Sequence, residues 1–194
     1  MKYLEEIIRK EGKILPGDIL KVDSFLNHQV NVEVMDKMGK EFARLFEDTN
    51  PDKILTIETS GVAIAQAVSL NMNRQPIIYA KKGVHLNMSN DVYQCKEKSY
   101  TKNVDYMIQV SKEYLHEGDR ILLIDDFLAN GEAMNSLLEI CAQAKVEVVG
   151  IGIVIAKMYQ PGYERIKKMY DRVEILAKVK SMNDNGEIEF EWKK

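Results

Sequence analysis

Apolar and polar residues alternate along the chain with two different periods, which predict a succession of helices and strands. Apolar residues at helical spacing predict helices over residues 2–10, 32–46, 62–70 and 134–144. Short apolar runs bounded by turn-forming residues predict strands over residues 54–57, 75–80, 104–110, 121–124, 146–156 and 172–179. A last pair of extended segments is expected around Asn185-Gly186. Strands that alternate with helices indicate an α/β protein with a parallel sheet and helices on both faces.

The composition narrows the class of protein. The 194 residues are enough for one domain with its own core, and 45% hydrophobic with 29% charged residues excludes intrinsic disorder. The net charge of −3 indicates no nucleic-acid partner, and no stretch approaches the roughly 20 apolar residues of a membrane span. Met1–Lys10 is charged and does not resemble a signal peptide. Cys95 and Cys141 are far apart, without metal-ligand spacing. We therefore expect a cytoplasmic protein without a membrane partner.

One segment, "ILLIDDFLANGEAMNSLL" from Ile121 to Leu138, carries candidate chemistry. The adjacent acids Asp125 and Asp126 end an apolar strand, and a small-residue loop leads from them into a helix. Such a loop at a helix N-terminus presents backbone N–H groups that suit a phosphate. Carboxylates repel phosphate, but they suit sugar hydroxyls or a divalent metal. A ribose 5-phosphate combines both groups, although an acidic strand end beside an ordinary loop is the simpler alternative.

The same segment resembles a known signature. "ILLIDDFLANGEA" is similar to the phosphoribosyl-pyrophosphate motif of type I phosphoribosyltransferases. "ILTIETSG" stands where that family places its pyrophosphate loop, and "YAKKG" resembles the basic segment after the next strand. The polar stretch 81–102 stands where the family has its flexible catalytic lid. The chain is thus identified as a member of this family.

Two further segments resemble the branch of the family that uses xanthine in bacterial purine salvage. They are "LKVDSFLNHQVN" near the N-terminus and "IVIAKMYQPG" near the end, so the resemblance covers nearly the whole chain. It implies a twisted, mainly parallel sheet flanked by helices. It also implies one domain with a hood from residues of about 1–35 and 157–194. Many family members have Thr, Gly and Thr where this chain has Asn130, Glu132 and Ala133, so the Glu132 side chain should point away from the phosphate or have a partner.

The resemblance assigns roles to individual residues. Asp125 and Asp126 would hold the ribose hydroxyls and stabilise positive charge on the sugar. The residues expected to bind phosphoribosyl pyrophosphate (PRPP) are Ala129, Asn130, Gly131, Glu132, Ala133, Thr59, Ser60, Gly61 and Lys81. Lys82 stands beside Lys81 as an alternative, and both lysines are open to the reading of solvated surface charges. The base would meet Leu20, Asn27 and Lys157, which supply an apolar face and hydrogen-bond donors.

The implied reaction is transfer of the phosphoribosyl group from PRPP to xanthine. Its products are xanthosine 5′-monophosphate and pyrophosphate, and Mg²⁺ is expected to arrive with PRPP rather than on a protein motif. Hypoxanthine, guanine or adenine as the base remains an alternative, as does a regulator that senses PRPP without turning it over. The family pairs its subunits, so a homodimer is expected as well.

Overall fold

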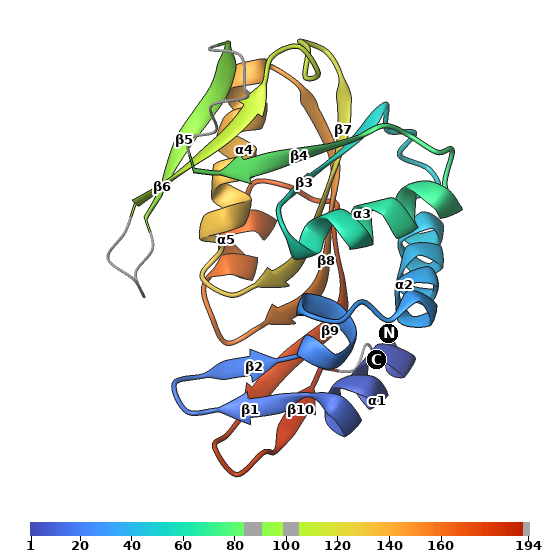
Figure 1. The fold of residues 1–194 in the computed structure, drawn as a ribbon, viewed down its shortest axis with the longest axis vertical. Helices are drawn as coiled ribbons and strands as arrows, with labels where there is room; N and C mark the ends of the chain where they lie inside the picture. Colours follow the sequence, from blue (N-terminus) through green and yellow to red (C-terminus); the bar gives the residue numbers. More distant parts are fainter. Residues whose placement is uncertain (84–90, 99–104, 192–194) are drawn as a thin grey trace.

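The computed structural model of the protein describes residues 1–83, 91–98 and 105–191. An eight-stranded sheet forms the centre of this part of the chain (Figure 1). From edge to edge its strands are β10 (Ile188–Phe190), β9 (Val173–Met182), β8 (Glu147–Lys157), β7 (Arg120–Leu128), β3 (Lys53–Ile57), β4 (Ile77–Lys82), β6 (Asp105–Ser111) and β5 (Val92–Lys98). The strands from β9 to β4 pair in parallel, whereas β10 and β6 run antiparallel to their neighbours. The predicted mainly parallel sheet is confirmed.

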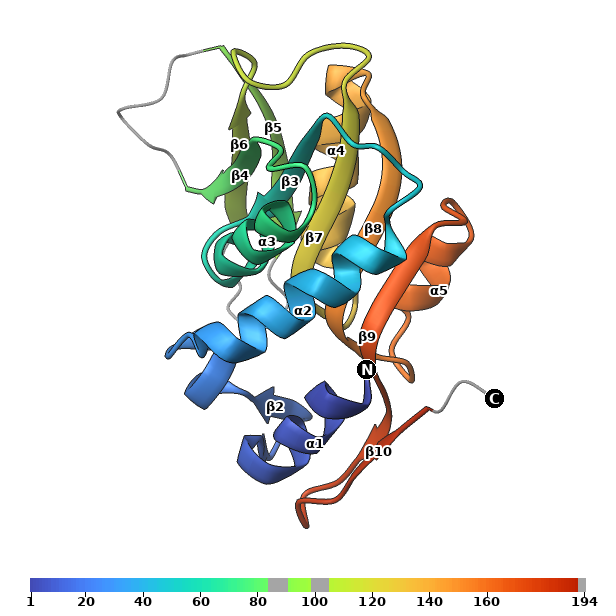
Figure 2. The same ribbon diagram turned by 90° about the vertical axis from the view of Figure 1, so that its right-hand side faces the viewer.

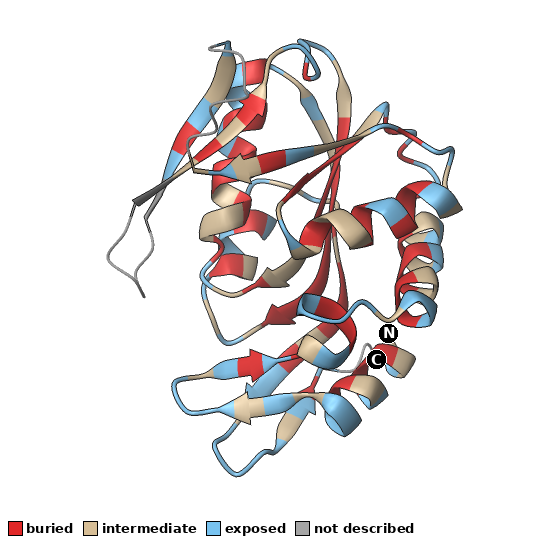
Figure 3. Cartoon of the chain, in the orientation of Figure 1, coloured by how far each residue is buried: buried red, intermediate tan, exposed pale blue. Residues whose placement is uncertain are grey.

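Helices cover both faces of this sheet (Figure 2). The helices α2 (Val32–Leu45) and α3 (Ser60–Asn71) lie over one face, and α4 (Glu132–Ala144) and α5 (Gly162–Lys167) lie over the other. Each face has its own apolar core, and Figure 3 shows the buried residues concentrated along the central strands. None of the helices in residues 1–83, 91–98 and 105–191 combines the length and apolar composition that crossing a bilayer requires.

The N-terminal segment forms a small layer below the sheet in Figure 1. It consists of α1 (Lys2–Glu11), a two-stranded hairpin of β1 (Lys13–Leu15) and β2 (Ile19–Lys21), and a π-helical turn η1 (Asp23–Asn27). Buried side chains of α1 and η1 share a core cluster with the ends of β9 and β10. This layer falls within residues 1–35 of the predicted hood, whose role stays a prediction, while most of β9 belongs to the central sheet.

Residues 81–102, expected as a lid, are partly strand. Lys81 and Lys82 end β4, and residues 92–98 form β5, which pairs antiparallel with β6. Residues 84–90 and 99–102 lie outside the described residues, so the lid stays a prediction. The sequence pattern did not indicate β1, β2, η1, β5 or α5. The strands β1 and β2 have three residues each, too few to establish a period, and β5 is a mostly polar segment without an apolar run.

The connection of the strands places a ligand-binding position at the centre of the sheet. From β3 the chain moves outward to β4, whereas from β7 it moves outward in the other direction, to β8 and β9. The neighbours β3 and β7 therefore flank a topological switch point. Loops diverge at the carboxyl ends of such strands, and ligands of α/β sheets bind in the crevice that this leaves.

Candidate functional site

The two predicted acids lie on β7 beside the switch point. The strand extends to Leu128, so Asp125 and Asp126 belong to its last residues rather than following it. Asp125 is 2% exposed and Asp126 is half-buried, because successive side chains of a strand point to opposite faces. Asp125 Oδ1 accepts the backbone N–H of Asp126 at 2.9 Å, and Asp126 Oδ1 accepts that of Phe127 at 2.8 Å. These bonds fix both carboxylates at the strand end.

The environment of Asp125 changes its acidity. Burial, and then the negative charge of Asp126, raise the pKa of Asp125 well above the ordinary value for an aspartic acid. The positive charge of Lys82 acts in the opposite direction and only partly offsets this rise in pKa. A pair of neighbouring acids in which one binds a proton more readily can hold hydroxyl groups and can also accept a proton.

A helix N-terminus follows the acids. Gly131 caps α4 with φ 88°, in the left-handed region that glycine adopts without steric cost, and it makes no side-chain capping bond. The helix begins at Glu132, two residues earlier than predicted, and its first intrahelical bond runs from the Asn135 N–H to the Gly131 carbonyl at 2.8 Å. The first N–H groups of a helix have no intrahelical partner. The predicted phosphate loop, Ala129–Ala133, therefore presents backbone donors.

Helix α5 supports this loop from below, which the sequence did not indicate. The Gly162 N–H donates to the Ala129 carbonyl at 3.0 Å. A Cβ atom on Gly162 would overlap that carbonyl oxygen and would come within 2.9 Å of the Gly131 nitrogen. The loop and α5 thus pack backbone against backbone, with no room for a side chain at Gly162. The only signal in the sequence is the Pro161-Gly162 pair, which by itself indicates no more than a turn.

Glu132 has an ion-pair partner, which explains how a negative side chain can stand beside a phosphate site. Its carboxylate lies 3.6 Å from the guanidinium of Arg165 on α5, and this guanidinium is 3.5 Å from the Asn130 carbonyl. A carboxylate in the first turn also interacts favourably with the helix dipole. The ion pair is partly exposed, so its contribution to stability is below about 1 kcal/mol. Its main effect is to direct the negative charge towards α5.

A second helix N-terminus, that of α3, follows β3 and lies beside the acids. Thr59 is the N-cap of α3 without a side-chain capping bond, and Ser60 and Gly61 form the first turn, so the helix starts earlier than predicted. The Glu58–Thr59 peptide bond is cis. A Cβ atom on Gly61 would overlap the Thr56 hydroxyl and would lie 3.8 Å from Asp125 Oδ1. The structure therefore brings the predicted Thr59-Ser60-Gly61 segment next to the acid pair.

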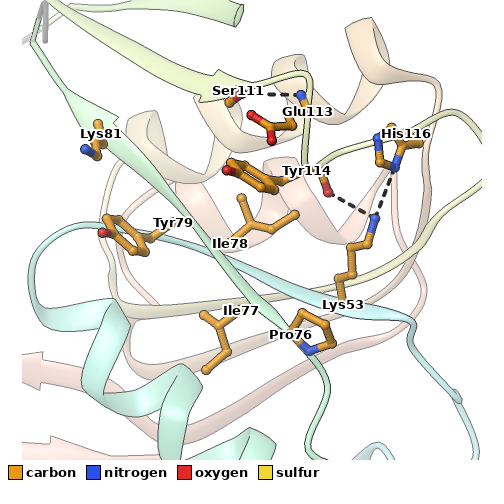
Figure 4. A pocket seen from close by; sticks show the side chains of 10 residues that line it. All are labelled: Lys53, Pro76, Ile77, Ile78, Tyr79, Lys81, Ser111, Glu113, Tyr114 and His116. Carbon is orange, nitrogen blue, oxygen red and sulfur yellow. Dashed lines mark hydrogen bonds between the residues drawn. The ribbon is translucent and has the colours of Figure 1, made fainter. Parts of the chain in front are cut away.

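The two lysines at the end of β4 differ in position. The Lys82 backbone N–H donates to Glu58 Oε1 at 2.7 Å, and the Lys82 charge acts on Asp125. Lys81 instead lines a groove beside Tyr79 (Figure 4). Adjacent residues of a strand point to opposite faces, so the two lysines cannot both approach Asp125 within one chain. The contact of Lys81 with pyrophosphate stays a prediction. Lys82 is the lysine whose positive charge acts on Asp125.

The predicted base-binding residues come from three elements. Leu20 on β2 is 8% exposed. The Asn27 Nδ2 group on η1 donates to Asp126 Oδ2 at 3.1 Å, which joins the hood to the acid pair. Lys157, the last residue of β8, is 8% exposed, and its ammonium lies 3.4 Å from the Asp18 carboxylate. No pattern in the sequence identified Asp18 as the partner of Lys157.

An acid pair between two helix N-termini, at the switch point of a parallel sheet, is an arrangement that suits a phosphorylated sugar. The chain belongs to the family of phosphoribosyl transferase domains, which it matches over residues 22–192. The family predicted from the sequence motifs is confirmed.

Individual relatives refine this assignment. The chain is 47% identical to the xanthine phosphoribosyltransferase of Pediococcus pentosaceus, over 98% of this chain and 100% of the relative. It is 51% identical to xanthine phosphoribosyltransferase 2 of Clostridium botulinum, over 91% and 93%. The fold is similar to the APRTase of Giardia lamblia in complex with 9-deazaadenine, with a TM-score of 0.75, 19% identity and coverage of 90% and 97%. The last comparison concerns the fold alone.

Proposed function

We propose that the protein transfers the phosphoribosyl group of PRPP to xanthine and releases xanthosine 5′-monophosphate and pyrophosphate. The position of Asp125 and Asp126 between the N-termini of α3 and α4 carries the proposal. Relatives named xanthine phosphoribosyltransferase, similar over almost their whole length, support the choice of base. Purine salvage in the cytoplasm is the proposed setting, since the phosphorylated substrate does not cross membranes unaided.

In this proposal each part of the site meets a different part of PRPP. The loop Ala129–Ala133 holds the 5-phosphate through backbone donors, and Thr59-Ser60-Gly61 meets the pyrophosphate in the same way. Asp125 and Asp126 hold the ribose hydroxyls and stabilise the positive charge that develops at C1 as pyrophosphate leaves. Because burial raises the pKa of Asp125, the acid pair can also take up the proton lost by the purine nitrogen.

Mg²⁺ is the cation that the proposal includes. Within the described ranges, no three or more His, Cys, Asp and Glu side chains gather into a group that could hold a metal ion. Mg²⁺ is commonly held by one or two carboxylates together with substrate phosphates. The half-buried carboxylate of Asp126 fits such a shared arrangement. The cation would offset the negative charge of the pyrophosphate.

The base would enter between the hood and the acids. Xanthine carries carbonyl groups at C2 and C6, so its site needs hydrogen-bond donors. Lys157 and Asn27 supply an ammonium and an amide, and Leu20 supplies an apolar contact for the ring. Adenine carries an amino group at C6 in place of a carbonyl, so a site built from donors disfavours it.

A comparison of four bases tests this proposal. We expect kcat/KM for xanthine to exceed the values for hypoxanthine and guanine by about 10-fold and that for adenine by roughly 100-fold. The measurement is steady-state nucleotide formation with PRPP and Mg²⁺ at matched base concentrations. Adenine turnover above xanthine turnover would contradict the choice of base. PRPP binding without turnover of any base would instead support the PRPP-sensing regulator.

We also propose that two copies of the chain pair through a groove beside β4. A groove of about 640 Å³ runs beside β4 and is bordered by the segment 111–116 (Figure 4). Tyr79 and Tyr114 in this groove are 44% and 56% exposed, and exposed aromatic side chains are enriched at protein interfaces. Lys81 lines the same groove. A second copy seated there would cover both tyrosines and would bring Lys81 towards the neighbouring site.

Light scattering tests the dimer. We expect a mass of twice the 22.3 kDa of one chain, and a shift towards one chain in Tyr79→Glu, because a buried charge opposes the contact. Met169→Glu is the matched control, since Met169 is 59% exposed and lies just beyond α5. A wild-type mass of one chain at micromolar concentration, or an equal shift in both variants, would argue against this interface.

A further inference from the structure

The side chains of Lys157, Tyr159 and Gln160 all contact Asp18, a residue to which the proposed function gives no role. It lies in the turn between β1 and β2, with φ 63°. Its Oδ1 atom accepts the Tyr159 hydroxyl at 2.6 Å, and its Oδ2 atom accepts the Gln160 amide. The Lys157 ammonium donates to the Asp18 carbonyl and lies 3.4 Å from Oδ2. One residue of the hairpin thus binds the chain segment that follows β8.

This attachment holds the turn of the hairpin, whose strands are anchored in the core by Leu20 and Ile14. The strands β1 and β2 have three residues each and form a sheet of their own, separate from the central one in the described part of the chain. An isolated two-stranded hairpin is marginally stable at best. Leu20, the residue proposed to contact the base, lies on β2 two positions after Asp18. The position of Leu20 therefore depends both on its burial in the core and on how firmly the turn is held.

The same contacts with Asp18 fix the position of the Lys157 ammonium. Its side chain is 9% exposed, and a buried ammonium is costly unless a counterion and hydrogen bonds compensate it. An ammonium has three N–H donors. The backbone carbonyl and the Oδ2 atom of Asp18 engage it from one side, so the remaining donor capacity is directed away from the turn. Burial, and then the hydrogen bond to Asp18, raise the pKa of Tyr159, so its hydroxyl stays a donor to this carboxylate.

We propose that Asp18 is a positioning residue for the purine base, which fixes the Lys157 ammonium and docks the hairpin that carries Leu20. This inference rests on the proposed function, because Lys157 and Leu20 are the residues proposed to contact the base. Asp18 acts through these neighbours: within the described part of the chain its side-chain hydrogen bonds join Lys157, Tyr159 and Gln160 rather than Asp125, Asp126 or the phosphate loop. It should therefore affect the base and leave PRPP unaffected.

Two substitutions of Asp18 test the proposal without straining the turn. Asn and Gly both tolerate the positive φ at this position, whereas Ala would not. Asp18→Asn keeps an oxygen acceptor and loses the charge, so we expect KM for the base to rise about 3-fold. Asp18→Gly removes every carboxylate contact and keeps only the backbone carbonyl that accepts from Lys157, and we expect a rise of about 10-fold or more. In both variants kcat and KM for PRPP should stay within about 2-fold of wild type.

Asp48→Asn is the matched control. Asp48 receives the Arg172 guanidinium at 2.7 Å, is more than half exposed, and pairs with the residue just before β9, at the opposite end of the strands. The Asp48→Asn substitution should leave KM for the base and KM for PRPP unchanged. Asp18→Gly combined with Lys157→Ala should weaken base binding by less than the product of the two single effects, because both changes remove the contact between Lys157 and the Asp18 carboxylate. Any loss beyond that of Lys157→Ala alone measures the docking of the hairpin through Tyr159 and Gln160.

The outcomes separate this inference from the proposed function. If wild type does not use xanthine, the proposed function fails, and the base that it does use serves to measure the effect of Asp18. Equal increases in KM for the base and for PRPP in Asp18→Gly would overturn the positioning role, as would an unchanged KM for the base. Thermal unfolding of each variant shows whether a loss of folded protein causes the change, and we expect the Asp18 variants to unfold within a few degrees of Asp48→Asn.

Discussion

Asp125→Asn combined with Asp126→Asn is expected to lower kcat/KM by at least about 1000-fold while the protein stays folded. Removal of one preorganised group that stabilises transition-state charge typically costs 100-fold to 1000-fold, and this variant loses two. The amide oxygens of asparagine can still accept the N–H groups of Asp126 and Phe127 that the carboxylates accept now, so the backbone at the strand end keeps its bonds. Steady-state kinetics with xanthine and PRPP measure the loss, and near wild-type activity would refute the assigned roles.

The stability of Asp125→Asn alone separates the charge of this residue from its structural role. Because burial raises the pKa of Asp125, the folded chain binds this proton more tightly than the unfolded chain, in which the pKa is about 4. The stabilisation from the bound proton is full below about pH 4, and it is lost as pH rises through the raised pKa. Asparagine stays neutral throughout, so the variant should gain stability relative to wild type as pH increases.

Thermal unfolding between about pH 4 and pH 8 measures this difference. We expect the variant to match wild type near pH 4 and to unfold at a higher temperature at pH 8. A lower unfolding temperature at pH 8 than at pH 4, each relative to wild type, would show that the Asp125 charge contributes favourable contacts that exceed its burial cost.

Gly162→Ala is expected to raise KM for PRPP by about 100-fold. The added Cβ atom would overlap the Ala129 carbonyl oxygen and crowd the Gly131 nitrogen, so the phosphate loop must move away from α5. Backbone donors at a helix N-terminus act over short distances, and a displacement of about 1 Å in a positioned site can cost a factor of 100. The substitution lies outside every segment that the sequence assigned to PRPP.

Gly186→Ala is the control for the general effect of adding a methyl group to a glycine. Gly186 has φ 87° in the C-terminal hairpin, and a Cβ atom there would meet nothing within 4 Å. The Gly186→Ala variant should lose about 1–2 kcal/mol of unfolding free energy through backbone strain and keep its KM for the base and for PRPP. A Gly162→Ala variant that is destabilised to a similar degree but binds PRPP normally would show that α5 does not set the shape of the loop.

The lysine pair at the end of β4 shows where sequence reasoning reaches its limit. The strand and its basic end were recognisable from "IIYAKK", but the pattern did not decide which lysine faces the acids. A shift of register by one residue exchanges the two faces of a strand. Pairing with β6 fixes that register, and Lys81 then lies in the groove while the Lys82 charge acts on Asp125.

The sequence by itself determined the features that are contiguous in the chain. The run from Ile121 to Leu138 contains a strand, two acids, a loop and a helix, and local periodicity and residue type suffice to recognise them. The tertiary structure alone decided the contacts between distant segments, such as Asn27 with Asp126, Glu132 with Arg165 and Lys157 with Asp18. The physical reason is that such contacts depend on how the strands are ordered and how α5 and the hood pack against them, which no local pattern in the chain encodes.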